Sequence, residues 1–251
     1  MTQREDRPPT RTRLESADLA AAWEENASQF VAWVRRPDHD SYWYFHRDLF
    51  LELMPPPGRR TLDLGCGEGR FPRDLEQRGH QVIGVDASAT LLEHARAADP
   101  AGDYRVADAA ALPLADDSVQ VVTALLSLHD MDDMDGAIRE AARVLTVGGR
   151  LCAAVVHPIN SGGRFASDDP DAAFVMRDSY FATRRYSDVV ERDGLRMTFN
   201  SIHRPLEAYV AAFESAGLLI ERLVEVPDPN YPPGHRWRRI PLFLHLRAVK
   251  V

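Results

Sequence analysis

The chain has 251 residues, of which 45% are hydrophobic and 27% charged, the composition of a globular domain. Its formal net charge of −8 argues against a nucleic-acid-binding protein, which needs a basic surface, and no run of about 18 apolar residues predicts a membrane span. The two cysteines lie in separate predicted elements, so we expect no disulfide and a reducing, cytoplasmic location. No cluster of histidines and cysteines predicts a metal site.

The residues before the first predicted strand divide into a tail and two helices. Residues 1–18 lack an apolar core and are expected to form a flexible, solvated tail. Apolar and aromatic residues recur at helical spacing over Leu19–Val34 and again over Tyr42–Met54, and a run of prolines starting at Pro55 ends the second helix. These aromatic rings suit packing against a sheet, but they also suit a pocket wall. We therefore predict a helical lid over residues 19–57.

Strands and helices alternate over residues 58–157, which is the pattern of a parallel α/β sheet. In chain order the strands are expected at Arg60–Leu64, Gln81–Asp86, Tyr104–Asp108, Val119–Leu125 and Arg150–Val156. The helices between them are expected at about Arg70–Arg78, Ser88–Ala98 and Asp135–Leu145.

The pattern changes over residues 158–204, which are predicted to hold a mobile loop and a β-hairpin. Its strands are expected at Tyr180–Val189 and Leu195–Ile202, with Asp193-Gly194 as the turn signal. The aromatic residues of this insertion suit a cover over a bound ligand. A two-stranded hairpin also needs a face to pack on, so a dimerisation arm is the alternative, and the protein is expected to be a monomer or a homodimer.

Residues 205–251 complete the predicted sheet. A helix is expected over Pro205–Ala216, followed by an antiparallel pair of strands at Leu218–Val226 and Leu242–Val249. The predicted fold is one α/β domain. It has a doubly wound, mostly parallel seven-stranded sheet with an antiparallel last strand, an N-terminal helical lid and a hairpin insertion after strand five.

A glycine-rich loop follows the first strand of this sheet. Glycines alternate over residues 65–69, directly after Asp63, and glycine lets a ligand approach the main chain and the N–H groups of a helix start. Asp86 ends the second strand, where an acid can accept hydrogen bonds from ribose hydroxyls, and Asp108 ends the third. Three neighbouring strand ends therefore predict one crevice for a ribose and an adenine.

These motifs resemble those of class I S-adenosylmethionine-dependent methyltransferases. The resemblance covers Arg60 to Val156 and rests on LDLGCGEGR, VIGVDAS, ADAAALPLADDSVQVV and AARVLTVGGRL. It implies a Rossmann-like fold and methyl transfer from S-adenosyl-L-methionine, with S-adenosyl-L-homocysteine as the product. The cofactor-binding residues that it implies are Asp63, Gly65, Cys66, Gly67, Asp86, Ala87, Asp108, Ala109 and Leu126.

Two alternatives stand beside this interpretation. A nicotinamide-dependent oxidoreductase is disfavoured because the spacing is G-x-G-x-G and a pyrophosphate would face the carboxylates of Asp63 and Glu68. A protein that binds S-adenosylmethionine without transferring a methyl group is the other alternative. Asp63 also has a purely structural interpretation, as a group that bonds the loop backbone.

Three histidines are candidates for a general base or for orienting the acceptor. His129 follows the fourth strand and is the first choice, His157 ends the fifth strand, and His203 precedes the last long helix. His46 in the aromatic helix is a further candidate, and each of the four also suits simple packing. The acidic composition and the absence of an N-P-P-Y-type tetrapeptide after strand four favour a small organic acceptor over a nucleic acid. We expect an aromatic or apolar acceptor from bacterial secondary metabolism, methylated on oxygen, nitrogen or carbon.

Overall fold

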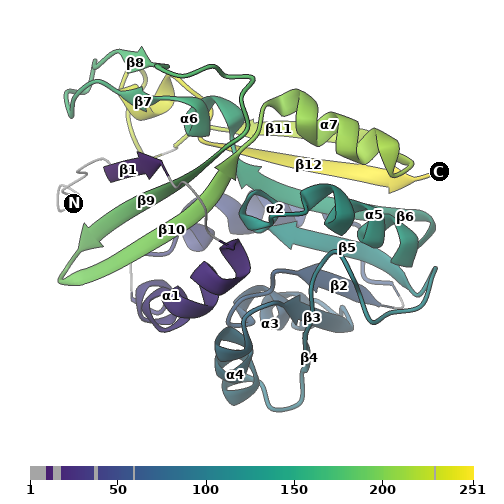
Figure 1. The fold of residues 1–251 in the computed structure, drawn as a ribbon. Coiled ribbons are helices and arrows are strands. Elements are labelled where there is room, and N and C mark those ends of the chain that lie inside the picture. The colour runs from purple at the N-terminus through teal and green to yellow at the C-terminus, as the bar shows by residue number, and fades with distance from the viewer. Residues whose placement is uncertain (1–9, 14–17, 37–38, 59, 229) are drawn as a thin grey trace.

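A seven-stranded sheet runs through the computed structural model, which describes residues 10–13, 18–36, 39–58, 60–228 and 230–251 (Figure 1). Its strand order is β11-β12-β6-β5-β2-β3-β4. The first five strands of this sheet in chain order, β2 to β6, are parallel, and β12 is antiparallel to both of its neighbours, as predicted. The strands are β2 (Thr61–Leu64), β3 (Val82–Asp86), β4 (Asp103–Val106), β5 (Val119–Leu125), β6 (Leu145–Val156), β11 (Leu218–Val226) and β12 (Phe243–Lys250).

Local capping sets the ends of the helices that connect these strands. The Ser88 hydroxyl accepts a hydrogen bond from the Leu91 N–H at 3.1 Å and so begins α4. The Asp133 carboxylate begins α5 in the same way, with the Gly136 N–H at 2.8 Å. Gly217, with φ +73°, follows the last turn of α7. The helices of this part are α3 (Arg70–Glu76), α4 (Ala89–Ala98), α5 (Met134–Val144) and α7 (Leu206–Ser215).

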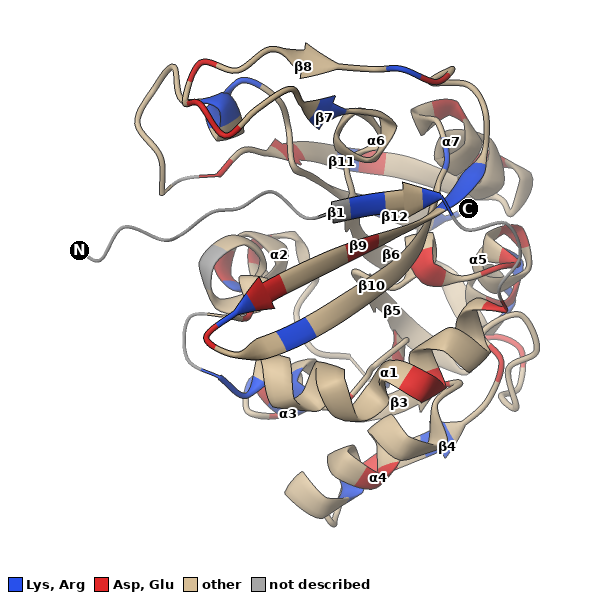
Figure 2. Cartoon of the chain, turned by 60° about the vertical axis from the view of Figure 1, so that its left-hand side comes forward, with Lys and Arg blue, Asp and Glu red and all other residues tan. Residues whose placement is uncertain are grey.

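The predicted hairpin is present and carries a third strand. It consists of β9 (Arg184–Arg192) and β10 (Leu195–His203), and Asp193 and Gly194 at its tip have φ of 49° and 76°. Positive φ at both central residues defines a type I′ turn, which suits the twist of a hairpin. Figure 2 shows β1 (Thr10–Arg13) beside β9, and the two strands pair antiparallel.

The prediction of a flexible tail over residues 1–18 is therefore wrong for residues 10–13; residues 1–9 and 14–17 lie outside the described part. The Arg11 guanidinium donates to both oxygens of Asp188 at 2.8 and 2.6 Å and lies over the Tyr186 ring at 4.4 Å. These partners come from far along the chain, so the local composition of the tail does not reveal them.

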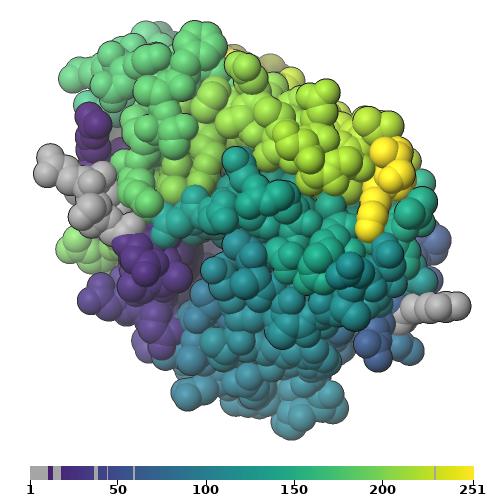
Figure 3. All heavy atoms as spheres, turned by 45° about the vertical axis from the view of Figure 1, so that its right-hand side comes forward, coloured from purple at the N-terminus to yellow at the C-terminus, as the bar shows by residue number. Residues whose placement is uncertain are grey.

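The N-terminal helices take two different places. Helix α1 (Leu19–Val34) has the predicted bounds and packs against β10 and α4. In Figure 3 its purple atoms lie against the green atoms of the hairpin region and the teal atoms of the core. The second predicted helix is a π-helix, Tyr42–His46, that continues as α2 (Arg47–Leu53). Helix α2 packs into the core, so the lid prediction for residues 19–57 does not extend to it.

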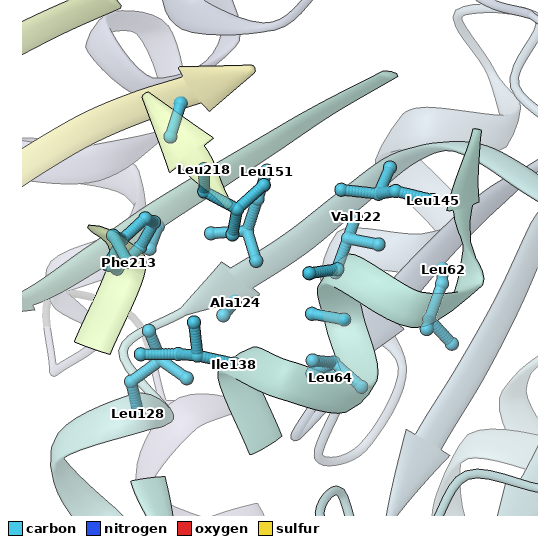
Figure 4. Close-up of a cluster of buried hydrophobic side chains, with 14 of the residues drawn as sticks. Leu62, Leu64, Val122, Ala124, Leu128, Ile138, Leu145, Leu151, Phe213 and Leu218 are labelled. Carbon is cyan, nitrogen blue, oxygen red and sulfur yellow. The ribbon is translucent and has the colours of Figure 1, made fainter. Parts of the chain in front are cut away.

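Hydrophobic clusters cover both faces of the sheet, because buried parallel strands are apolar on both sides. Strand β6 shows the alternation, since Leu151 and Ala153 join one cluster while Cys152 and Ala154 join the other. The larger cluster lies between the sheet and helices α5 and α7 (Figure 4). Its labelled members are Leu62, Leu64, Val122, Ala124, Leu128, Ile138, Leu145, Leu151, Phe213 and Leu218.

Short elements complete the chain beyond β5 and β6. They are η2 (Leu128–Asp130), α6 (Pro158–Gly162), β7 (Arg164–Phe165), β8 (Phe174–Val175) and η3 (Arg236–Arg238). Within the described ranges no helix has the length and apolar character needed to cross a membrane.

Candidate functional site

A cavity of about 760 Å³ opens at the carboxyl ends of β2, β3 and β5 and extends under α1 and the hairpin. This is the edge at which open α/β sheets bind ligands. All nine residues predicted to bind the cofactor line it. They are Asp63, Gly65, Cys66, Gly67, Asp86, Ala87, Asp108, Ala109 and Leu126.

The glycine loop forms one wall of the cavity with conformations that side chains disfavour. Gly65 and Gly67 have φ of +69° and +58°. A Cβ on Gly65 would lie 2.4 Å from Cβ of Ser127, so this position has no room for a side chain. Gly67 N–H donates to Asp86 Oδ2 at 2.8 Å, which joins the loop to the end of β3.

Acidic side chains follow the strand ends around this loop. Asp63 is buried and accepts a hydrogen bond from the Thr123 hydroxyl at 2.6 Å, and burial raises its pKa to about 7. Asp86 accepts from the N–H groups of Gly67 and Ser88 at 2.8 and 2.9 Å, while burial raises its pKa. Each raised pKa records a cost of keeping these carboxylates charged, and a bound cation lowers that cost.

Asp108 is exposed at the rim of the cavity. Its Oδ1 accepts a hydrogen bond from the Ala110 N–H at 2.9 Å, and its Oδ2 takes no part in that hydrogen bond. Leu126, on the opposite side of β2, has φ +57°, which is costly for a side chain of this size and is typical of functional sites.

Helix α1 covers the cavity with aromatic rings and is fixed to the sheet side by one carboxylate. Glu24 accepts hydrogen bonds from the hydroxyls of Ser88 and Thr90 at 2.5 and 2.6 Å, directly beside the end of β3. Trp23 and Phe30 pack edge to face with ring centroids 5.3 Å apart, and both line the cavity. Trp33 of α1 and Phe199 of β10 line it too.

His129 lines the cavity, and its role toward the acceptor stays a prediction. The residue is 5% exposed, and burial lowers its pKa to about 3, so the imidazole is neutral at physiological pH. Its Nε2 lies 3.5 Å from Oδ1 of Asp130.

The other predicted histidines lie elsewhere. His157 begins α6, with Nδ1 accepting the Ile159 N–H at 3.1 Å and Nε2 placed 3.1 Å from Glu225. His203 uses both ring nitrogens, on the Ser161 hydroxyl at 2.7 Å and the Tyr180 carbonyl at 2.8 Å. Neither is among the described residues that line the cavity, so the structure gives them capping and packing roles in place of the predicted catalytic one.

His46 pairs with a residue that the sequence did not connect to it. Its Nδ1 lies 3.0 Å from Nε2 of His245 in the core, and burial lowers the pKa of both rings. Over the described ranges, no group of three or more His, Cys, Asp or Glu side chains is arranged to hold a metal ion.

The far half of the cavity contains residues that sequence reasoning missed. Asp130 adjoins His129 in the chain, so the motif itself offered that signal. The remaining residues come from distant segments and have no local signature. They are Arg11, Asn160, Ser201, Trp237 and Phe243.

Comparison with known proteins gives one family. Residues 62–153 match the family described as a methyltransferase domain. The chain is 31% identical to methyltransferase GfsG of Streptomyces halstedii, over 74% of this chain and 62% of that protein. It is 36% identical to malonyl-(acyl-carrier protein) O-methyltransferase of Pectobacterium atrosepticum, over 43% of this chain and 44% of that one. The chain thus spans less than two thirds of either relative.

A solved structure is similar over a larger part of the chain. The crystal structure of an S-adenosylmethionine dependent methyltransferase from Mesorhizobium loti superimposes with a TM-score of 0.68. The two sequences are 26% identical, and the match covers 84% of this chain and 99% of that one.

Proposed function

We infer that the chain belongs to the class I, Rossmann-like S-adenosylmethionine-dependent methyltransferases, and we propose that it transfers a methyl group to a small organic acceptor bound in its cavity. The observation that carries this proposal is that a single cavity has two connected parts, one suited to a methyl donor and one suited to an acceptor. The donor part is the crevice of strand-end acids and glycines, and the acceptor part is the chamber under α1 and the hairpin.

The residues of the crevice fit S-adenosylmethionine, the cofactor of this family. Asp63 and the glycine loop would hold the methionine portion, Asp86 the ribose hydroxyls, and Asp108 with Ala109 the adenine. The fit rests on charge and space, because carboxylates with raised pKa gain from a cation and Gly65 and Gly67 leave the main chain open. When bound, S-adenosylmethionine supplies an electrophilic methyl group on a sulfonium that is a good leaving group.

The protein's own contribution is to position the acceptor and exclude water. Orientation of two reactants contributes on the order of 7–11 kcal/mol to a barrier. Trp23 and Phe30 of α1 and Tyr186 and Phe199 of the hairpin give the chamber rigid apolar walls. We therefore propose that α1 and the hairpin act as a cover and that the hairpin is not a dimerisation arm.

His129 is proposed to orient the acceptor. Because its pKa is lowered to about 3, the neutral ring offers one N–H donor and one lone pair but is a weak base at neutral pH. Replacement of His129 by alanine is expected to lower turnover more than cofactor affinity.

The acceptor is proposed to be a planar or apolar compound of bacterial secondary metabolism, and the protein to work in the cytoplasm as a monomer or homodimer. The aromatic lining of the chamber supports a planar or apolar acceptor. The match to methyltransferase GfsG of Streptomyces halstedii supports the role in bacterial secondary metabolism.

The test is the formation of S-adenosylhomocysteine from S-adenosylmethionine with a panel of small acceptors. The proposal predicts product with at least one aromatic or apolar compound, and predicts that S-adenosylhomocysteine binds in calorimetry. Tight binding together with no transfer across the panel would favour the alternative, a cofactor-binding protein without activity.

A further inference from the structure

The proposed function leaves open which group takes up a proton during methylation and what kind of acceptor fits the chamber. Resting on that function, we propose that Asp130 receives the proton of the acceptor, and that the acceptor is an uncharged hydroxyl compound. The evidence lies in the position of Asp130, its contacts, its ionisation and the charges that surround the cavity.

Asp130 is tied closely to the cofactor crevice. It ends η2, four residues after Leu126, and both residues line the cavity. The Ser127 hydroxyl donates to the Leu64 carbonyl at 2.6 Å, which fixes this turn to the start of the glycine loop. Arg204 Nη2 donates to the carbonyl of Met131 at 2.7 Å, so the segment is anchored on both sides of Asp130.

The Asp130 carboxyl retains hydrogen-bonding capacity. Its side chain is 12% exposed, and the Ser201 hydroxyl of β10 donates to it. Among the residues that the structure describes, Oδ1 accepts no hydrogen bond, and neither does Nδ1 of His129. Buried polar atoms without partners cost free energy and are uncommon, so a ligand hydroxyl is a fitting partner for this pair.

The ionisation of the two residues separates their roles. Burial raises the pKa of Asp130 to about 8, against the lowering effects of Ser201 and Arg204, whereas burial lowers that of His129 to about 3. A general base works best when its pKa is near the operating pH. A cationic ligand in the same cavity favours the carboxylate further. The titratable and charged groups that face Asp130 are His129 of η2, Tyr186 of β9, Arg204 after β10 and Tyr209 of α7.

The charges of the cavity select against an anionic acceptor. The two arginines among its described lining residues are already paired, Arg11 with Asp188 and Arg70 with Asp40. Some lining acids are paired as well, Glu68 with Arg73 and Asp132 with Arg185, but the described lining residues offer a carboxylate acceptor no unpaired arginine. The acids that line the cavity are Asp18, Asp40, Asp63, Glu68, Asp86, Asp108, Asp130, Asp132, Asp133 and Asp188.

A hydroxyl also explains why a base is present. As the acceptor's O–H bond breaks, its proton passes to the Asp130 carboxylate and the oxygen forms the new bond to the methyl carbon. The carbon–sulfur bond breaks, and its electron pair stays on sulfur as a neutral thioether. The carboxyl group of Asp130 afterwards returns the proton to water.

The test uses 1-naphthol and 1-naphthoate as probes, because they share a ring system and differ in charge. In the 251-residue protein loaded with S-adenosylhomocysteine, fluorescence titration should show that 1-naphthol binds more tightly than 1-naphthoate. The initial rate with S-adenosylmethionine and 1-naphthol should fall roughly 10²–10⁴-fold in Asp130→Asn. The matched control is Asp135→Asn, an exposed acid of α5 outside the cavity lining, which should keep the wild-type rate.

A second variant keeps the test informative if Asp130→Asn folds poorly. Ser201→Ala removes a hydrogen bond that lowers the pKa of Asp130. The rising limb of kcat/KM against pH should therefore move to higher pH, with the affinity for S-adenosylhomocysteine unchanged.

Three results would overturn the inference while leaving the proposed function in place. They are a wild-type rate in Asp130→Asn, an unmoved pH profile in Ser201→Ala, and tighter binding of 1-naphthoate than of 1-naphthol. Absence of S-adenosylhomocysteine binding by the wild-type protein would instead contradict the proposed function, and this inference with it.

Discussion

Asp86 joins three parts of the site through one carboxylate. It ends β3, accepts the Gly67 N–H of the loop and accepts the Ser88 N–H at the start of α4. Each oxygen keeps a second lone pair, so a ribose diol can bind without displacing the backbone contacts.

Replacement of Asp86 by alanine is expected to weaken S-adenosylhomocysteine binding, because hydrogen bonds to a charged group contribute about 1.5–3 kcal/mol. That is roughly a ten- to hundredfold loss of affinity in calorimetry. Asp48→Ala, which removes an exposed acid of α2, serves as the control and should bind like wild type. Equal affinities for the two variants would remove the ribose contact from this account.

A comparison of Gly65 with Gly148 separates two costs of adding a side chain, the strain of a positive φ and the lack of space. Gly65→Ala places a methyl group 2.4 Å from Ser127 at positive φ, whereas Gly148→Ala, also at positive φ, meets nothing within 4 Å. Denaturant unfolding should therefore show a loss of about 1 kcal/mol for Gly148→Ala and a clearly larger loss for Gly65→Ala. Similar losses would mean that the loop relaxes to accept a side chain.

The roles of the histidines are harder to predict from the sequence than the positions of the cofactor residues. Asp63, Asp86 and Asp108 are placed by strand ends, and a strand end is visible in the sequence pattern. The roles of His157 and His203 depend on Glu225 and Ser161 respectively, which lie far away in the chain.

In the proposed role of α1 as a cover, its attachment to the sheet side controls ligand exchange. Its Glu24 bonds to Ser88 and Thr90 hold it beside Asp86, and a ligand bound beneath it would leave after the helix moves.

Glu24→Ala is expected to speed the dissociation of S-adenosylhomocysteine several-fold in stopped-flow measurements. Glu25→Ala changes the neighbouring exposed acid on the same helix and should dissociate like wild type. If both variants match wild type, these bonds do not hold the cover closed.

Elements with a local pattern were predicted well and elements made by distant pairing were not. Helix α1, strand β5 and strand β11 have the predicted bounds because hydrophobic spacing and turn residues define them. Strand β1 was missed because its partner, β9, is about 170 residues away, as the Arg11–Asp188 bond shows. The π-helix at Tyr42–His46 likewise has no signature in residue spacing.

At the scale of the whole molecule, the distribution of charge differs between the surface and the cavity. In Figure 2 the basic positions are scattered over several elements and interspersed with acidic ones. Acidic side chains outnumber the two arginines among the described residues that line the cavity, which favours a cationic cofactor and disfavours anionic ligands.

These buried acids make stability depend on pH. The pKa of Asp63 is raised to about 7 and that of Asp130 to about 8, so at neutral pH the folded state holds more protons than the unfolded state. The stability that these two carboxyl groups contribute is therefore lost as pH rises from about 4 to about 7 for Asp63 and to about 8 for Asp130, by up to about 1.4 kcal/mol per pH unit for each group. Below about pH 6.5 the buried neutral histidines act in the opposite direction, so the loss shows in the whole protein between about pH 6.5 and 8.

Thermal unfolding against pH checks this expectation. The midpoint of wild type should decline across that range, and Asp63→Asn should decline less. Asp135→Asn should follow wild type. Parallel curves for all three proteins would contradict the assigned ionisation of Asp63.

A crystal structure of the protein with bound S-adenosylhomocysteine tests the central claim most directly. The account predicts ribose hydroxyls on the Asp86 carboxylate, adenine beside Asp108, and the homocysteine portion against the glycine loop at residues 65–69. A ligand bound elsewhere, or an Asp86 that keeps only its two backbone contacts, would contradict it.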